Sequence, residues 1–332
     1  MVSVIVICYN QEKSIAAALD SVLRQDESVP FEIVIGDDAS IDHTREICQG
    51  YADKYPDKVR LLPQEPNLGL VKNYFRCLKA CRGEYISDCA GDDEWLGTTR
   101  ISDAMKIFES HPEVNSVFTD YIIFDTATRI SHQAYSSEFE DRKFNPIIKK
   151  ETLLRKTLNR TNSLPYMLST AVFRRKDLED VMKDASEMVC NEEFGCEDVP
   201  IIAALASKGD AAFNPAVTLK YNIISNSISN NSDRLKSAHF YLKSLRMSRI
   251  LGRYYGITEK EMTDTFRTKS LYLASAAFDI NDKTLALEIE QEIYSWSLNP
   301  SLKCKTYFYL RKFHSARYAV SKLKYLFNTK GM

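Results

Sequence analysis

The first part of the chain alternates between short apolar runs and longer segments with helical periodicity. The runs Val2–Ile7 and Phe31–Ile35 are rich in β-branched residues and almost continuously apolar, as expected of strands buried on both faces of a sheet. Between them, apolar residues at positions 15, 18, 19, 22 and 23 recur with the period of a helix over 14–24. Strands that alternate with helices predict βαβ units and a mainly parallel sheet.

The alternation continues to about residue 230 and then gives way to helices alone. Further strands are predicted at 59–62, 85–89, 114–124, 169–173 and 217–224, and further helices at 42–51, 71–80 and 98–110. The polar run Ser225–Asp233 predicts a loop or a domain boundary. Beyond it, Thr258 with Glu261 forms a capping box, and Asp282 can cap the following helix. We therefore expect an α/β domain over residues 1–230 and a helical extension over residues 231–332.

Two adjacent carboxylates, Asp92 and Asp93, follow the predicted strand at 85–89 and Gly91. Carboxylates at the carboxyl end of a strand in an open α/β sheet lie at the crevice where such sheets bind ligands. Two neighbouring anions repel each other and need a cation, hydrogen-bond donors or open water. A divalent metal that also holds substrate phosphates would supply that cation. Gly-Asp-Asp is also good turn chemistry, so this segment taken alone leaves a solvated turn open.

The composition is that of an ordinary soluble protein, with 332 residues, 44% hydrophobic residues, 27% charged residues and a formal net charge of −1. This charge argues against a dedicated nucleic-acid binder. Eight cysteines without a Cys-x-x-Cys pair indicate reduced thiols, not a disulfide framework or a zinc site. No apolar run approaches the roughly 18 residues that span a bilayer. We expect a cytoplasmic protein, or one peripheral to the inner face of a membrane.

Two common nucleotide-binding motifs are absent from the sequence. No Gly-x-Gly-x-x-Gly follows the first predicted strand, which removes the dinucleotide fingerprint. No Gly-x-x-x-x-Gly-Lys-Ser/Thr occurs either, which removes the P-loop. A nucleotide, if bound, must therefore be held by other groups.

Five short segments follow one another in a defined order. They are 3–10 ending in Tyr-Asn, 32–44 with Asp-Asp-Ala-Ser-Ile-Asp-His-Thr, 67–73 with Asn-Leu-Gly and Lys-Asn, 83–93 ending in the aspartate pair, and Glu197-Asp198. In this order the chain resembles the family 2 glycosyltransferases of GT-A fold over about residues 1–230. The resemblance implies an inverting, metal-dependent enzyme of cell-surface polysaccharide or glycan synthesis. Such an enzyme moves a sugar from a nucleotide-diphosphate donor, by default a UDP-sugar, to a hydroxyl of a saccharide or lipid-linked saccharide.

The resemblance assigns nucleotide contacts to Tyr9, Asp38, Lys72 and Asp92. Tyr9 would stack on the base through its π-face, and Asp38 would accept a hydrogen bond from a base N–H or a ribose hydroxyl. The alternatives stay open at this point. Tyr9 is equally a half-buried loop tyrosine, Asp38 and Asp37 are turn or cap residues, and Lys72 is a solvated helix lysine.

The resemblance also implies a metal centre and a catalytic pair. Asp93 would be the main ligand of Mn²⁺ or Mg²⁺, and Asp92 would contact the metal or the ribose. The metal would clamp the diphosphate and offset charge on the departing phosphate oxygen. Family members often carry a further acid two residues before this pair, where this chain has Ala90. Asp198 would be the general base, with Glu197 orienting the acceptor or tuning the base, although both acids also suit a helix N-terminus.

The chain departs from the family at the diphosphate. Many relatives carry Tyr-Arg and a later His, where this chain has Tyr221-Asn222 and Asn226-Ser227-Ile228-Ser229. We expect Arg234 or Lys236 to replace those contacts, and Asp88 to be buried in its strand. A different class is a catalytically inactive nucleotide-sugar-binding module, which the presence of both Asp93 and Asp198 disfavours. A sugar-nucleotide pyrophosphorylase would carry a Gly-rich loop after the first strand, whereas Cys8–Lys13 contains no glycine.

The C-terminal tail has its own pattern, because no acidic residue follows Glu292. Apolar residues at Ala316, Leu323 and Phe327 form one helical stripe that Arg317 and Lys324 flank. Such a helix suits an anionic membrane interface, and it equally suits packing against the transferase domain or against a second copy in a homo-oligomer. Flotation of liposomes with the full chain and with a chain that ends near residue 300 would separate the two interpretations.

Overall fold

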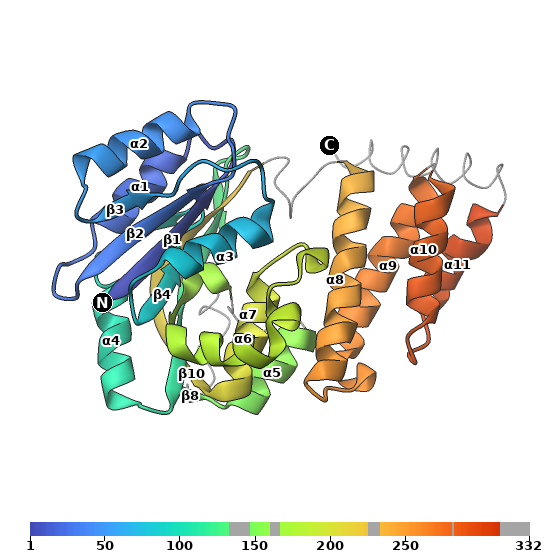
Figure 1. Cartoon of the computed structure of the whole chain (residues 1–332). Coiled ribbons are helices and arrows are strands. Elements are labelled where there is room, and N and C mark those ends of the chain that lie inside the picture. Colours follow the sequence, from blue (N-terminus) through green and yellow to red (C-terminus); the bar gives the residue numbers. More distant parts are fainter. Residues whose placement is uncertain (133–146, 160–166, 225–232, 281, 313–332) are drawn as a thin grey trace. The chain divides into compact units, whose positions relative to one another are not determined.

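The computed structural model describes residues 1–132, 147–159, 167–224, 233–280 and 282–312. It comprises two compact units: residues 1–157 with 162–224 form the first, and residues 158–161 with 225–332 form the second. The first unit is a mixed α/β domain with one sheet between helices, and the second consists of helices (Figure 1). The predicted α/β fold class with a helical C-terminal extension is confirmed.

The described strands of the first unit belong to one sheet, whose main path has the order β3-β2-β1-β4-β9-β6-β10-β5. The strands are β1 (Val2–Cys8), β2 (Phe31–Asp37), β3 (Val59–Leu61), β4 (Tyr85–Asp88), β5 (Glu94–Trp95), β6 (Val114–Asp125), β7 (Ile130–His132), β8 (Ile147–Ile148), β9 (Ala171–Arg174) and β10 (Asp210–Ile223). The predicted parallel pairing is confirmed for β3-β2-β1-β4 and for β6 with β10. The sheet as a whole is mixed, because β9 runs antiparallel to both β4 and β6 and short strands pair antiparallel with β6 and β10.

Helices cover both faces of this sheet (Figure 1). They are α1 (Ile15–Leu23), α2 (Thr44–Lys54), α3 (Leu70–Ala80), α4 (Arg100–Ser110), α5 (Lys150–Asn159), α6 (Arg175–Val189) and α7 (Asp198–Lys208). Alternate residues of β1 point to opposite faces: Val4 and Val6 pack in one core cluster with α1, and Ile5 packs in another with α3. Burial on both faces explains why these strands read as continuous apolar runs in the sequence.

The strand order reverses at β1, because the chain passes outward to β2 and β3 and then returns to form β4 on the other side. The carboxyl ends of β1 and β4 therefore border the crevice where open α/β sheets bind ligands. The backbone N–H of Gly91 donates to the carbonyl of Ile7 (3.1 Å). A Cβ at Gly91 would lie 2.9 Å from Cys8 Cβ, closer than Cβ atoms pack, as well as 2.3 Å from the movable Gln11 Oε1, so the close approach of the two loops favours glycine at this position.

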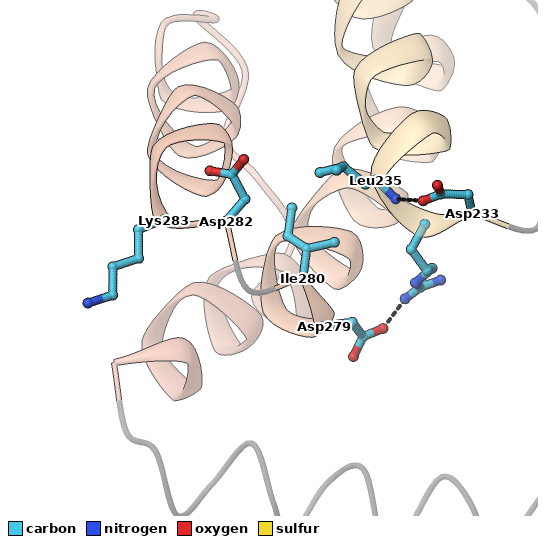
Figure 2. Close-up of a pocket in the computed structure, with 7 residues that line it drawn as sticks. Asp233, Leu235, Asp279, Ile280, Asp282 and Lys283 are labelled. Carbon is cyan, nitrogen blue, oxygen red and sulfur yellow. Dashed lines mark hydrogen bonds and ion pairs between the residues drawn. The ribbon is translucent and has the colours of Figure 1, made fainter.

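The second unit is built from α8 (Arg234–Tyr254), α9 (Thr263–Asp279), α10 (Lys283–Tyr294) and α11 (Leu302–Arg311). Asp233 caps α8 by accepting from the N–H of Leu235 (2.8 Å; Figure 2). The predicted capping box of Thr258 and Glu261 is confirmed, on a 3₁₀ turn that leads into α9. The predicted cap at Asp282 is also confirmed, with the N–H of Leu285 as its donor (2.9 Å).

Of three predictions about the C-terminal part, only the one on Arg234 or Lys236 falls on described residues. The stripe at Ala316, Leu323 and Phe327 and the segment Asn226–Ser229 lie outside them. Arg234, considered for the diphosphate, begins α8 and pairs with Asp279 of the same unit. Among the helices that the structure describes, none is both long enough and apolar enough to cross a bilayer.

Candidate active site

The loop after β1 is held rigidly by the loop after β2. Asn10 adopts a positive φ of 51°, and its N–H donates to Ser40 Oγ (2.9 Å) while its Oδ1 accepts from the N–H of Ile41 (2.9 Å). Gln11 is fixed in the same way, since its N–H donates to Thr44 Oγ1 (2.7 Å). This scaffold carries Tyr9, whose side chain is 48% exposed. An exposed aromatic ring on a fixed loop is available for stacking on a flat ligand.

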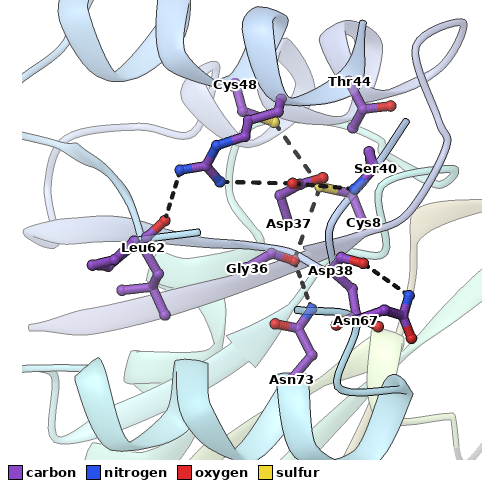
Figure 3. A network of polar contacts seen from close by, with 12 residues as sticks. Cys8, Gly36, Asp37, Asp38, Ser40, Thr44, Cys48, Leu62, Asn67 and Asn73 are labelled. Carbon is purple, nitrogen blue, oxygen red and sulfur yellow. Dashed lines mark hydrogen bonds and ion pairs between the residues drawn. The ribbon is translucent and has the colours of Figure 1, made fainter. Parts of the chain in front are cut away.

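The two aspartates after β2 have different surroundings (Figure 3). Asp37 is buried, and one of its oxygens lies 3.6 Å from the guanidinium of Arg45. Asp38 accepts from the backbone N–H groups of Leu68 (2.7 Å) and Gly69 (2.9 Å), which stand at the start of α3. Asp38 therefore ties β2 to α3, as the turn interpretation requires. Each of its oxygens keeps a lone pair for one more donor, so its contact with a nucleotide stays a prediction.

Lys72, on the first turn of α3, forms an ion pair with Glu192 (2.8 Å). Both side chains are 52% exposed, and exposed pairs of this kind contribute little to stability. The pair links α3 to the segment that precedes α7. The nucleotide contact of Lys72 stays a prediction, and the ammonium keeps further N–H donors for it beside Glu192.

Asp93 is a buried carboxylate with one oxygen left unbonded by the described residues. Its side chain is 1% exposed, Oδ1 accepts from the backbone N–H of Asn222 (3.0 Å), and Oδ2 is buried with no hydrogen-bond partner among the described residues. Burial, and then the neighbouring charge of Asp92, raises the pKa of Asp93 well above its ordinary value. Burial also raises the pKa of Asp92, which a hydrogen bond with Gln11 opposes. A cation beside these two carboxylates would therefore stabilise their ionised form.

The residues present fit a hard divalent cation. Carboxylate oxygens are the ligands that magnesium and manganese prefer, and such ions are commonly held by one or two carboxylates together with substrate phosphates. The buried, unpartnered Oδ2 of Asp93 is a ligand atom without another function in the described part of the chain. Those described residues contain no cluster of three or more His, Cys, Asp or Glu side chains with metal-binding geometry. Asp92 and Asp93 would therefore need phosphate or water to complete a coordination shell.

A buried arginine supplies a positive charge near Asp88 and Asp93. Arg100, at the start of α4, stacks on the ring of Trp95 (4.1 Å to the centroid) and donates to the carbonyl of Ser169 (2.6 Å). Its positive charge opposes the rise in the pKa of both Asp88 and Asp93. Arg100 therefore provides a fixed counter-charge within the protein, at a distance that leaves Asp93 Oδ2 without a bond.

The predicted catalytic pair begins α7 and lies close to β4. Asp88 is buried, as predicted, and accepts from the hydroxyl of Tyr74 (3.1 Å). Burial and the nearby charge of Glu197 raise the pKa of Asp88. Burial and the charge of Asp198 raise the pKa of Glu197 to about 8, so Glu197 is largely protonated at neutral pH. Asp198 Oδ1 accepts from the N–H of Val199 (2.7 Å), which leaves Asp198 as the better candidate for a base.

The pKa of Glu197 predicts a pH-dependent stability. An ordinary glutamate titrates near 4.5, so the folded protein must bind the proton more tightly than the unfolded chain does. Stability from this group is complete below about pH 4.5 and is lost as the pH rises toward about 8. Glu197→Gln removes this titration. We therefore expect the Tm of the variant, relative to that of the wild type, to rise by a few degrees as the pH increases from 5 to 8. Thermal unfolding across this range, with the exposed Glu187→Gln as control, measures the difference; parallel curves for wild type and Glu197→Gln would contradict it.

The structure thus brings together the ends of β1 and β4, with Tyr9, Asp92 and Asp93. It connects Glu197 to β4 through Asp88, and it commits Asp38 and Lys72 to partners within the protein. No sequence pattern indicated that Gln11, Tyr74 and Arg100 are neighbours of these acids. Asn222 could have been found, because it stands where the chain departs from the family pattern; its side-chain amide donates to the carbonyl of Asp92 (2.7 Å).

The sheet order and the helices on both faces are those of a GT-A-type fold. Residues 1–349 of TarS from S. aureus, solved with UDP, align with a TM-score of 0.53 at 22% identity, covering 83% of this chain and 70% of that one. The mannosyltransferase PcManGT from Pyrobaculum calidifontis, solved with GDP-Man and Mn²⁺, aligns with a TM-score of 0.54 at 17% identity, covering 97% and 86%. At these identities the likeness concerns the fold.

The family follows from the sequence comparison. The model described as Glycosyl transferase family 2 matches residues 3–182, and the chain belongs to this family. An uncharacterised protein of Mycobacterium tuberculosis is 34% identical over 165 residues, which are 49% of this chain and 46% of that protein. The curated S. aureus protein TarS, named a poly(ribitol-phosphate) β-N-acetylglucosaminyltransferase, is 34% identical over 110 residues, which are 33% of this chain and 19% of TarS. The chain thus spans about half the length of the mycobacterial relative and less of TarS.

Proposed function

We propose that the protein transfers a sugar from a nucleoside-diphosphate donor to a hydroxyl of a saccharide or lipid-linked saccharide, with inversion at the anomeric carbon. The observation that carries this proposal is the Asp92–Asp93 pair beside the switch point, with one buried carboxylate oxygen that has no partner in the described residues. The name of TarS supports a cell-surface polymer as the kind of acceptor. The donors present in the neighbouring structures, UDP-GlcNAc and GDP-Man, support a nucleotide sugar.

Donor binding would use the ends of β1, β2 and β4. Tyr9 would stack on the base, and Asp38 would accept from a base N–H or a ribose hydroxyl without giving up its two backbone donors. Asp93, with Asp92, would hold Mn²⁺ or Mg²⁺ against the diphosphate. When bound, the ion would supply Lewis-acid stabilisation of the departing phosphate oxygen. The Mn²⁺ in the structure of PcManGT supports this choice of ion.

Transfer requires an acceptor oxygen that loses its proton as it attacks. Asp198 would take that proton while the oxygen forms a bond to the anomeric carbon on the face opposite the leaving group. The bond from the anomeric carbon to the phosphate oxygen breaks, and the nucleoside diphosphate departs with the bonding electrons. Glu197, protonated at neutral pH, would donate a hydrogen bond and orient the acceptor. Direct displacement by a single base produces inversion.

A screen of nucleotide sugars tests the proposed function. Purified full-length protein is mixed with UDP- and GDP-sugars, with Mn²⁺, Mg²⁺ or EDTA, and both thermal stabilisation and release of nucleoside diphosphate are measured. We expect one donor to stabilise the protein and to be hydrolysed slowly, in both cases only with metal. Stabilisation without any hydrolysis or transfer would instead identify a nucleotide-sugar-binding module. No response to any donor would overturn the proposal.

Replacement of Tyr9 tests the base contact. Tyr9→Ala should weaken donor binding by roughly 5- to 100-fold, because stacking of a base on an aromatic ring is worth about 1–3 kcal/mol. Tyr9→Phe keeps the ring and should bind the donor nearly as tightly as the wild type. Since the side chain is 48% exposed, both variants should keep the wild-type Tm. Calorimetric titration with the nucleoside diphosphate provides the affinities, and equal binding by all three proteins would exclude stacking by Tyr9.

A further inference from the structure

The C-terminal helical part of the chain has a net positive charge, whereas the rest has a net negative charge. Residues 225–332 contain 18 Lys and Arg against 9 Asp and Glu, whereas residues 1–224 contain 26 against 36. A near-neutral total therefore hides a formal charge of +9 on residues 225–332 and of −10 on residues 1–224. A unit with this excess of cations attracts anionic ligands over several ångströms, to a degree that depends on salt.

Most acids of this unit are already used by its own architecture. In the hollow at the start of α8 (Figure 2), Asp233 caps α8, Asp279 pairs with Arg234, and Asp282 caps α10. On α10, Glu292 accepts from Arg249 (3.0 Å). This hollow is lined by three acids and two cations, a formal net charge of −1, so it has no net attraction for an anion.

A second hollow, of about 540 Å³, lies between α9 and α11 and has a different lining. Two cations stand at its border, Arg267 of α9 and Lys303 of α11, and both are exposed. Neither has an ion-pair partner among the described residues, and no acidic side chain follows Glu292 in the sequence. The two cations are thus available to a ligand from outside.

Aromatic rings and hydroxyls complete the lining. Tyr272 of α9 is held by Tyr241 of α8, with ring centroids 4.2 Å apart, and Tyr307 of α11 packs on Phe278 at 5.7 Å. Ser275 lies on the same face of α9 as Tyr272. Packed tyrosines present fixed apolar faces with polar tips, and fixed groups bind with a smaller loss of conformational entropy.

We propose that this α9–α11 groove binds an anionic saccharide, meaning a sugar or polyol segment that carries phosphate or carboxylate groups. Arg267 and Lys303 would hold the acidic groups, the rings of Tyr272 and Tyr307 would cover the C–H faces of the sugar units, and Ser275 would bond their hydroxyls. A hollow of this size holds a ligand of small-molecule dimensions, so it would grip a short stretch of a longer chain. On the proposed transferase function this stretch belongs to the acceptor, and the groove would retain it between transfers.

Binding by the full-length protein tests the groove independently of any transfer. Fluorescent dextran oligosaccharides are compared in phosphorylated and neutral form, with inorganic polyphosphate as an anion without sugar and phosphatidylglycerol vesicles as a lipid source of phosphate. We expect phosphorylated dextran to bind best and to weaken as salt is raised. Arg267→Glu with Lys303→Glu should reduce its affinity at least about tenfold, and the milder Arg267→Gln with Lys303→Gln should reduce it less.

The matched control changes the same charge elsewhere on the unit. Lys260→Glu with Lys305→Glu replaces two exposed lysines that do not line the groove, and we expect it to keep most of the affinity. Equal losses in both double variants, or equal binding of neutral dextran, would overturn the proposal. Vesicle or polyphosphate binding that is stronger than dextran binding and is lost only in the groove variant would also overturn it. Because these lysines and arginines lie outside the donor site, donor-dependent stabilisation should be unchanged, which separates failure of the groove from failure of the proposed function.

Discussion

Asp93→Asn is expected to abolish metal-dependent binding of the donor and to lower turnover at least about a hundredfold, since metal stabilisation of transition-state charge is worth several kcal/mol. The variant keeps the shape of the side chain and removes the charge that would hold the ion. Asp93→Ala should have the same functional effect. Calorimetric titration of the nucleoside diphosphate with and without Mn²⁺ measures the binding, and unchanged metal-dependent binding in the variant would contradict the assignment.

Stability gives this prediction a second readout. Burial and Asp92 raise the pKa of Asp93, so ionised Asp93 destabilises the folded protein increasingly as the pH rises through its raised pKa. Without metal, Asp93→Asn should therefore be at least as stable as the wild type at neutral pH. With Mn²⁺ and nucleotide, only the wild type should gain in Tm. Asp53→Asn, an exposed change on α2, is the control and should behave as the wild type does.

The N-terminal half of the fold could be predicted because its signals are local. β1 and β2 are buried on both faces and therefore show continuous apolar runs, and the helices that follow them carry apolar residues at helical spacing. The direction of β9 could not be predicted in this way. Its three apolar residues before Arg174 form the same kind of run whether they pair parallel or antiparallel. The pairing depends on β4 and β6, which are distant in the sequence.

In the candidate site, too, residues that are adjacent in the sequence could be predicted, and contacts between distant segments could not. Asp92 and Asp93 could be found because a strand, a glycine and two acids are adjacent in the chain. The partners of Asp38 and Lys72 could not, since Gly69 and Glu192 reach them only through the fold. The family pattern describes ligand contacts and contains no information on these internal bonds. The same holds for Arg100, a charged residue that is buried only because Trp95 and the carbonyl of Ser169 receive it.

The missing acid at Ala90 is not replaced by its neighbour in the strand. Asp88 lies two residues earlier, is buried, and accepts from Tyr74. Within the described residues it joins no metal-binding cluster with Asp92 and Asp93. Burial, and then the charge of Glu197, raise the pKa of Asp88, whereas the charge that raises the pKa of Glu197 is that of Asp198. Asp88 therefore interacts electrostatically with Glu197 of the predicted catalytic pair. A metal would be held by only two carboxylates, those of Asp92 and Asp93.

The role of the catalytic pair leads to the second large effect. Asp198→Asn should lower turnover at least about a hundredfold, the lower range for loss of a general base, and leave donor affinity near the wild-type value. The amide keeps an oxygen that can accept from the N–H of Val199, so the start of α7 should be preserved. It cannot take the acceptor's proton. Steady-state kinetics with the donor found in the screen, together with donor titration, separate the two quantities.

Glu197→Gln is the matched control for Asp198→Asn, because it is the same change one residue away. With the pKa of Glu197 at about 8, the wild-type side chain is already neutral at pH 7, and glutamine resembles that state. We expect Glu197→Gln to retain activity within about tenfold at neutral pH, because the amide N–H can replace the carboxyl O–H as hydrogen-bond donor to the acceptor. If Asp198→Asn loses less than tenfold and Glu197→Gln loses more than a hundredfold, the base is Glu197.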